Sequence, residues 1–215
     1  MKLTLQLVET TQEIRNAIIE ASIPVINNML TKVATVAKPT IQHIVEEEIK
    51  SSPEYQSMVD SGGKLRGALG LVDPMSQLDS IIDIIKSDIE MVSVPAQKTG
   101  KTITGGFRLE VVRGNYENIL NSRIATFVSE NNYLVPWLEW LLTAGKSRVV
   151  QDYVIKYGPS PFSRTGLAVM SKKPGGGFSI PGEFAGTQEN NFITRALERA
   201  NAKILEIIQK AMESA

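Results

Sequence analysis

The first quarter of the chain has hydrophobic residues at helical spacing. One line consists of Ile14, Ile18, Ala21, Val25, Met29, Val33 and Val36, and a second line beside it of Ile19, Ile23, Ile26 and Leu30. Thr10 followed by Glu13 has the form of a capping box, so a helix is expected to begin there. Two apolar lines make a wide surface, which fits either a helix in the core of a monomer or one packed against another subunit.

Prolines and short motifs divide this helical region, about residues 10–60. Pro24 is expected to kink the first helix, and Pro39 to restart it. Further helix starts are predicted where Ser52 precedes Pro53 and where Asp73 precedes Pro74, because proline suits the first helical position. Ser61-Gly62-Gly63 should interrupt the helical pattern between them. Before the first helix, Leu3, Leu5 and Leu7 alternate as in a short strand.

Alternating hydrophobic and polar positions predict β-structure in the middle of the chain. Residues 89–112 read as two strands joined by a polar loop. A short helix and an exposed turn are expected in residues 116–128. The densest hydrophobic run is Trp137–Met170, which reads as a helix ending at Gly145, then a strand, a Pro/Gly turn and a second strand.

The C-terminal part of the chain contains a glycine-rich stretch and a predicted long helix. Pro174-Gly175-Gly176-Gly177 is predicted to be a hairpin loop. The last helix, about residues 188–214, should be capped by Thr187 or Asn190. The sequence thus predicts one α+β domain over residues 1–215, in which an antiparallel sheet in a mixed body (61–185) is flanked by long N-terminal and C-terminal helices.

The composition excludes several kinds of catalytic and metal-binding site. The 215 residues carry 23 basic and 23 acidic side chains, no cysteine and one histidine, so thiol catalysis, disulfides, zinc-thiolate sites and a multi-histidine metal site in one chain are excluded. The first 60 residues are net acidic and residues 121–175 net basic, an asymmetry that head-to-tail contacts between copies can use. No signal peptide or run of about 20 apolar residues is present, so a soluble protein made in a cytoplasm is expected.

The remaining reactive side chains form no catalytic pattern. Asp79 and Asp83 share a helical face, but they fit the wet side of an amphipathic helix. Glu46-Glu47-Glu48 points in three directions and is expected to be a solvated face, and His43 a structural or surface residue. The remaining candidates fail on spacing or sequence: the pairs Ser171-Lys172 and Lys86-Ser87 do not share a helical face, and Lys64 is not followed by Ser or Thr as a phosphate loop requires. No catalytic, cofactor-binding or metal-binding residue is assigned, and no enzyme is predicted.

Basic and aromatic residues alternate across the later strands. They are Arg148, Lys156, Arg164, Lys172 and Lys173, with Tyr153, Tyr157 and Phe162. This pattern is compatible with a groove along a strand, but the sequence contains no known nucleic-acid-binding module signature, and direct specific binding is not predicted.

Several of these stretches resemble virion proteins of tailed bacteriophages. They are WLEWLLTAG (137–145), Asp152-Tyr153, GPSPFSRTG (158–166), SGGKLRG (61–67), LGL (69–71) and NFITRAL (191–197). The chain is similar to the neck and tail-completion class, which includes relatives of minor tail protein Z. The resemblance touches about half of the chain.

The resemblance implies a structural protein without cofactors. Copies would form a closed ring, expected to be a hexamer, that joins the head connector to the tail and contacts adjacent connector or tail rings. DNA would pass through the channel without specific binding, and the protein would be found in the virion neck or tail after assembly in the bacterial cytoplasm, with no membrane contact. Lys172–Gly177 is the candidate docking loop. Alternatives are a tail terminator or tube protein, a hydrolase or nuclease using Asp79 and Asp83, and a bacterial oligomeric adaptor.

Overall fold

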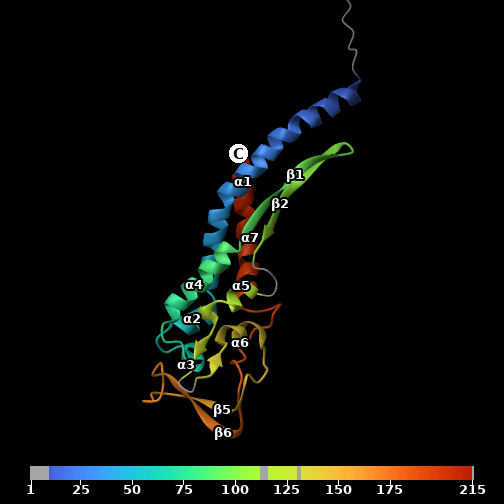
Figure 1. Cartoon of the computed structure of the whole chain (residues 1–215). Helices are drawn as coiled ribbons and strands as arrows, with labels where there is room; N and C mark the ends of the chain where they lie inside the picture. The colour runs from blue at the N-terminus through green and yellow to red at the C-terminus, as the bar shows by residue number, and fades with distance from the viewer. Residues whose placement is uncertain (1–9, 112–115, 130–131, 215) are drawn as a thin grey trace, which may run out of the picture.

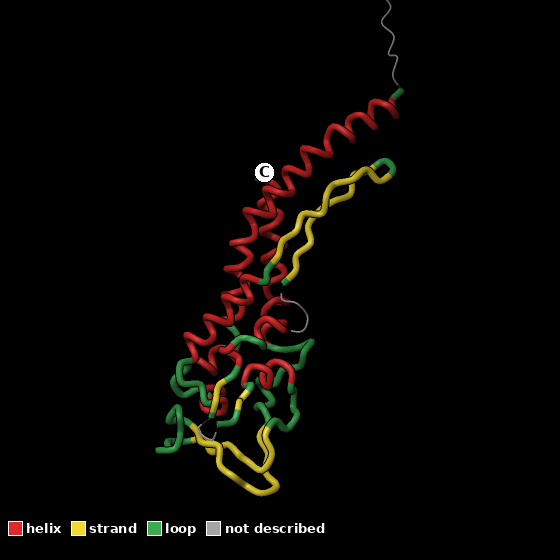
Figure 2. The backbone as a smooth tube through the Cα atoms, viewed as in Figure 1, coloured by secondary structure: helices red, strands yellow, loops and turns green. Residues whose placement is uncertain are grey.

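The chain folds into helices and three small strand pairs. The computed structural model describes residues 10–111, 116–129 and 132–214. This part contains seven α-helices, one 3-10 helix and three two-stranded antiparallel sheets. The fold is α+β, with a long helix near each end of the chain, as the sequence predicts. Figure 2 shows that the expected β-structure is divided into separate pairs. In the described residues β1 pairs only with β2, β3 only with β4 and β5 only with β6. The predicted strand at Leu3, Leu5 and Leu7 lies outside the described residues.

Helix α1 (Thr11–Lys50) is one continuous helix of 40 residues. Its predicted capping box is confirmed: the Thr10 hydroxyl accepts from the amide of Glu13, and the Glu13 carboxylate accepts from the amide of Thr10 at 2.7 Å. Figure 1 shows its axis curving within the N-terminal half, the part that contains Pro24. The predicted restart at Pro39 is wrong. Pro39 faces solvent, and the buried face of the helix runs past it without interruption, from Val33, Ala37 and Ile41 to Val45.

Helix α7 (Phe192–Glu213) runs antiparallel to α1 and packs along it (Figure 1). The predicted cap of this helix is wrong, because the N-cap is Asn191 rather than Thr187 or Asn190. The fully buried Asn191 side chain accepts from the amides of Ile193 and Thr194 and also donates to the Tyr116 hydroxyl at 2.8 Å. A tertiary hydrogen bond therefore selects the capping residue among three polar neighbours.

A long hairpin extends beside the N-terminal half of α1. Strands β1 (Glu90–Thr99) and β2 (Thr102–Glu110) match the predicted alternation. The Asn27 side chain of α1 accepts from the Ala96 amide at 2.6 Å, and Lys98 forms an ion pair with Glu20 at 3.1 Å. We call residues 11–36, the β1–β2 hairpin and residues 203–213 of α7 the stalk. Figure 1 shows that it projects away from the rest of the molecule, which we call the body.

The body is built around a buried apolar core. Its helical elements are α2 (Pro53–Val59), α3 (Lys64–Leu69), α4 (Pro74–Ser87), α5 (Glu117–Leu120), η1 (Arg123–Ala125) and α6 (Trp137–Thr143), and a small strand pair joins β3 (Phe127–Val128) to β4 (Leu134–Val135). The caps predicted at Ser52 and Asp73 are confirmed. Trp137 is fully buried and donates to the main-chain carbonyl of Ile124 at 2.9 Å. Helix α6, which begins at Trp137, thus packs into the core.

Strands β5 (Val150–Tyr157) and β6 (Ala168–Phe178) pair at the end of the body farthest from the stalk (Figure 1). The prediction of a hairpin loop at Pro174–Gly177 is wrong, because these residues lie within β6. Gln151 pairs with Gly177 and Tyr153 with Lys172, so the residues between form a wide bulge opposite Asp152. Asp152 has a positive φ of 59°, and its carboxylate accepts from the amide of Gly175 at 2.8 Å, which stabilises the bulge.

Candidate functional site

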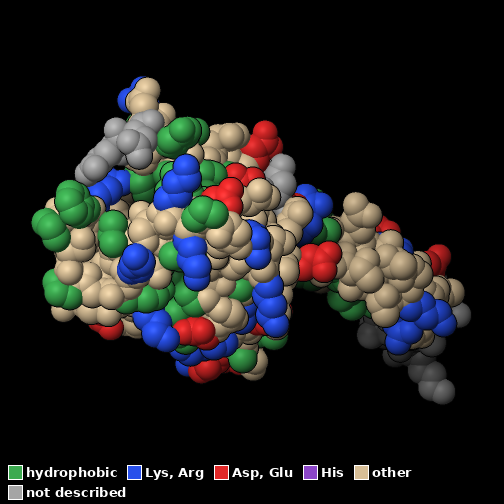
Figure 3. Space-filling model, turned by 90° about the horizontal axis from the view of Figure 1, so that it is seen from below, with side chains coloured by type: hydrophobic (Ala, Val, Ile, Leu, Met, Phe, Trp, Pro, Cys, Tyr) green, Lys and Arg blue, Asp and Glu red, His purple; other side chains and the backbone are tan. Residues whose placement is uncertain are grey.

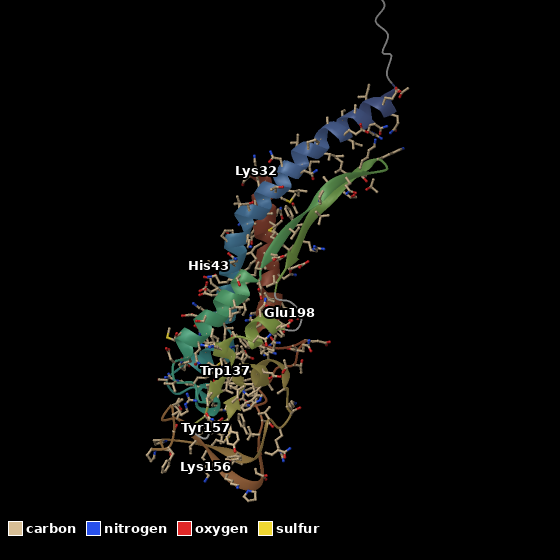
Figure 4. All side chains as sticks on the ribbon, in the orientation of Figure 1. Lys32, His43, Trp137, Lys156, Tyr157 and Glu198 are labelled. Atoms are coloured by element: carbon tan, nitrogen blue, oxygen red, sulfur yellow. The ribbon has the colours of Figure 1, made fainter. Side chains whose placement is uncertain are left out.

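The acidic triplet of α1 forms three separate contacts. Glu46 accepts from Lys50 at 2.8 Å and from Lys86 at 2.7 Å. These hydrogen bonds lower the pKa of Glu46 to about 2. Glu47 lies 3.5 Å from the imidazole of His43, and both are exposed; Figure 4 labels His43 on the outer side of the helix. The three carboxylates therefore do not converge, and His43 is a surface residue, as the sequence predicts.

Glu48 departs from the prediction of a solvated face. It is 9% exposed, and its carboxylate accepts from Lys203 at 2.6 Å and from Arg199 at 3.0 Å. The hydrogen bonds from Lys203 and then Arg199 lower the pKa of Glu48 despite the opposing effect of desolvation. A third contact from α7 joins Arg195 to the buried Glu54 of α2. These carboxylates hold α7 against the C-terminal end of α1.

The candidate carboxylate pair is engaged by different lysines. Asp79 lies 3.2 Å from the ammonium group of Lys50, and Asp83 lies 4.0 Å from Lys86. Within residues 10–111, 116–129 and 132–214, no group of three or more His, Cys, Asp or Glu side chains is placed to hold a metal ion.

The serine–lysine pairs and the Lys64 segment are parts of local structure. The Ser87 hydroxyl donates to the Ile84 carbonyl at 2.7 Å, while the ammonium of neighbouring Lys86 is bound to a carboxylate. Ser171 pairs across the sheet with Val154, and Lys172 is exposed.

Lys64 begins α3 and binds Glu183 at 3.1 Å. Gly67 allows α3 to approach β6, because a Cβ there would lie 3.3 Å from the Cβ of Ala168. Gly67 therefore serves packing.

An open apolar cavity lies between β5–β6, α3, α6 and the β3–β4 pair. Its volume is about 510 Å³, and five aromatic rings line it: Phe127, Tyr133, Trp140, Tyr153 and Phe162. Arg164 is the one charged side chain among the described lining residues, and its guanidinium lies 4.2 Å from the centre of the Phe127 ring. Sequence reasoning named Tyr153, Phe162 and Arg164 but missed Phe127 and Tyr133, because residues 20 or more positions apart meet only in the folded chain.

The stalk has hydrophobic side chains that no described residue covers. Ile18, Val25 and Val36 on α1 are 61%, 69% and 67% exposed. Ile18 and Val25 are seven positions apart and therefore lie on the same side of the helix. On α7, Leu205 and Met212 are also exposed and also seven positions apart. The stalk thus presents apolar helix faces to solvent.

Comparison of the chain with protein-family models, with curated proteins and with solved structures finds no match. Among the helices of the described residues, none combines the length and the apolar character that crossing a bilayer requires.

Proposed function

We propose that this chain is a structural subunit of a tailed-bacteriophage virion, forming a ring that joins the head connector to the tail. The observation that carries the proposal is the exposed apolar face of the stalk. Isolated exposed aliphatic residues are common, but Ile18 and Val25 form one helix side, with Val36 farther along the same helix. A second copy of the chain is the occupant that we propose for this face.

Covering this face would contribute favourably to association. Complete burial of a valine or isoleucine side chain contributes about 1.5–3 kcal/mol. Since Ile18, Val25 and Val36 are about two-thirds exposed, covering all three would contribute on the order of 3–6 kcal/mol at each interface. In a closed ring every subunit makes two such interfaces, which adds to the stability of the assembly.

The resemblance to neck and tail-completion proteins supports the finer assignment. It implies a ring, expected to be a hexamer, between connector and tail rings in the virion, with DNA passing through its channel. Assembly would take place in the host cytoplasm. The carboxylate hydrolase or nuclease gains no support from Asp79 and Asp83, because each lies beside a different lysine.

The copy number in purified particles tests the assignment. Quantitative mass spectrometry should find about six or twelve copies in each particle if the chain forms one or two hexameric rings. Hundreds of copies would contradict the proposal and indicate a tube or capsid component. Absence from particles would also contradict it.

A matched pair of variants tests the surface itself. Val25→Asp places a charge on the stalk face, whereas Val72→Asp places one on an exposed valine of the body, 53% exposed, outside the proposed interface. We expect Val25→Asp to be lost from particles while Val72→Asp is incorporated normally, with both variants folded by circular dichroism. Equal incorporation of the two would rule out this face as the interface.

A further inference from the structure

The exposed aromatic side chains gather at one end of the molecule. All 13 aromatic residues of the chain lie in described segments, and three of them are exposed: Phe162 at 81%, Tyr133 at 70% and Tyr157 at 54%. Phe162 and Tyr133 line the same cavity, and Figure 4 labels Tyr157 beside the β5–β6 pair. Flat rings that are open to solvent at one site are suited to stacking against another planar group.

Uncompensated positive charge covers the same end. Five exposed cations, none of which lies within 4.0 Å of a carboxylate in the described chain, come from β5, β6 and the segment before β5: Lys146, Arg148, Lys156, Lys172 and Lys173. The nearby Asp152 carboxylate, which accepts from a backbone amide, contributes one negative charge against these five cations, and Glu183 forms an ion pair with Lys64. Figure 3, which views this end directly, shows Lys and Arg side chains spread among hydrophobic ones. The local field therefore favours an anion.

The cations and the rings lie in neighbouring positions. Lys172 on β6 pairs with Tyr153, whose ring lines the cavity, so these two side chains leave the strand pair on the same face. Arg164 lies over Phe127 in that cavity, two residues after Phe162. Phosphates bound by the lysines would consequently hold the attached bases within reach of the rings.

We propose that the β5–β6 end of the body binds single-stranded nucleic acid without sequence specificity. The lysines and arginines contact phosphates, and Phe162, Tyr133 and Tyr157 stack on unpaired bases. Cations alone would suit any polyanion, but the three exposed rings favour a strand whose bases are unpaired. This inference does not depend on the proposed ring, since the β5–β6 end lies opposite the stalk (Figure 1).

Fluorescence anisotropy with a labelled 20-nucleotide oligo-dT tests the proposal on the full chain. Phe162→Ala should weaken binding about tenfold or more, because it removes a stacking ring. Met75→Ala, at an exposed apolar residue of α4 that belongs to neither proposed surface, is the matched control and should bind like the wild type. Both positions are mostly exposed, so neither change is expected to disturb the fold.

Salt dependence tests the phosphate contacts. If Lys156 and Lys172 each neutralise one phosphate, the double variant Lys156→Ala/Lys172→Ala should lower the slope of log K against log salt by about 1.4. The control Lys32→Ala/Lys101→Ala removes two exposed charges from the stalk and should leave the slope unchanged.

Competition by two other polyanions tests whether a single strand is the preferred ligand of this surface. Duplex DNA of the same length and a poly-glutamate peptide should each compete more weakly than the single strand, because neither offers unpaired bases. Equal competition by either, or wild-type affinity in Phe162→Ala, would overturn the proposal in favour of phosphate-only contact or an acidic protein partner. No binding of oligo-dT at low salt would overturn it as well, whether or not the chain is found in virions.

Discussion

The contact between Glu48 and α7 offers a direct test of what holds the long helices together. Glu48→Gln keeps the shape of the side chain but removes its charge, and so weakens the hydrogen bonds from Lys203 and Arg199. Hydrogen bonds to charged groups contribute about 1.5–3 kcal/mol, and exposed ion pairs about 0.2–1 kcal/mol. Since the Arg199 and Lys203 side chains are 42% and 55% exposed, water screens both contacts. We therefore expect a loss of about 1–2 kcal/mol in the free energy of unfolding.

Urea denaturation and thermal melting measure this loss. For a chain of this size, about 1.5 kcal/mol corresponds to a decrease in Tm of about 3–6 °C. Glu47→Gln is the matched control, because the adjacent Glu47 is exposed and, among the described residues, its one ion pair is with His43, at 3.5 Å. The control should remain within about 0.5 kcal/mol of the wild type.

The pH dependence of the free energy of unfolding tests the same contact independently. The pKa of Glu48 is lower in the folded chain than its ordinary value of 4.5. Its stabilising contribution is therefore present above pH 4.5 and is lost as the pH falls through the lowered folded pKa. The difference between the wild type and Glu48→Gln should shrink on acidification. If the two proteins unfold alike at pH 7, the hydrogen bonds to Glu48 do not hold α7 against α1.

Three further measurements probe other parts of the fold. The two lysines that bind Glu46 lower its folded pKa to about 2. The contribution of Glu46 to the free energy of unfolding should therefore be lost as the pH falls from about 4.5 to 2. Glu46→Gln should consequently show a weaker decrease of stability with falling pH over this range. An unchanged decrease would refute this. Trp137→Phe should cost about 2–4 kcal/mol in urea denaturation, because it leaves a cavity and an unpaired Ile124 carbonyl; a loss below 1 kcal/mol would count against this packing. Gly105→Ala should destabilise the hairpin by about 1–3 kcal/mol, since its Cβ would lie 2.7 Å from the backbone of the facing strand. Gly106→Ala meets nothing within 4 Å and should be neutral or slightly stabilising, so equal Tm values for the two would contradict the geometry.

Local signals in the sequence determined most element types and several helix starts. Thr10 with Glu13, Ser52 with Pro53 and Asp73 with Pro74 satisfy helix amides within one turn, so these starts depend on nearest neighbours alone. The period-two pattern over residues 89–112 likewise sufficed for the β1–β2 hairpin. These predictions succeed because the physical cause lies within a few residues of the effect.

Where local sequence signals compete, only the tertiary structure determined which local conformation forms. Pro39 breaks helices in isolation, but the buried face of α1 continues across it, so packing keeps the helix intact. Asn191 became the cap because it also binds Tyr116. The glycines after Pro174 resemble a loop, yet Asp152 and Gly175 fix them as a bulge within β6.

The candidate surfaces also depend on distant residues. The sequence shows alternating charges and rings, but only folding brings Phe127 and Tyr133 to Phe162 around one cavity. Burial of Glu48 follows from the packing of α7 on α1, whose charged groups are some 150 positions apart. Conversely, the wide apolar surface of α1 was visible in sequence, and the fold shows which part of it stays uncovered. Sequence determines which side chains can pack or bind, and the tertiary structure decides which of them meet and which remain open to a partner.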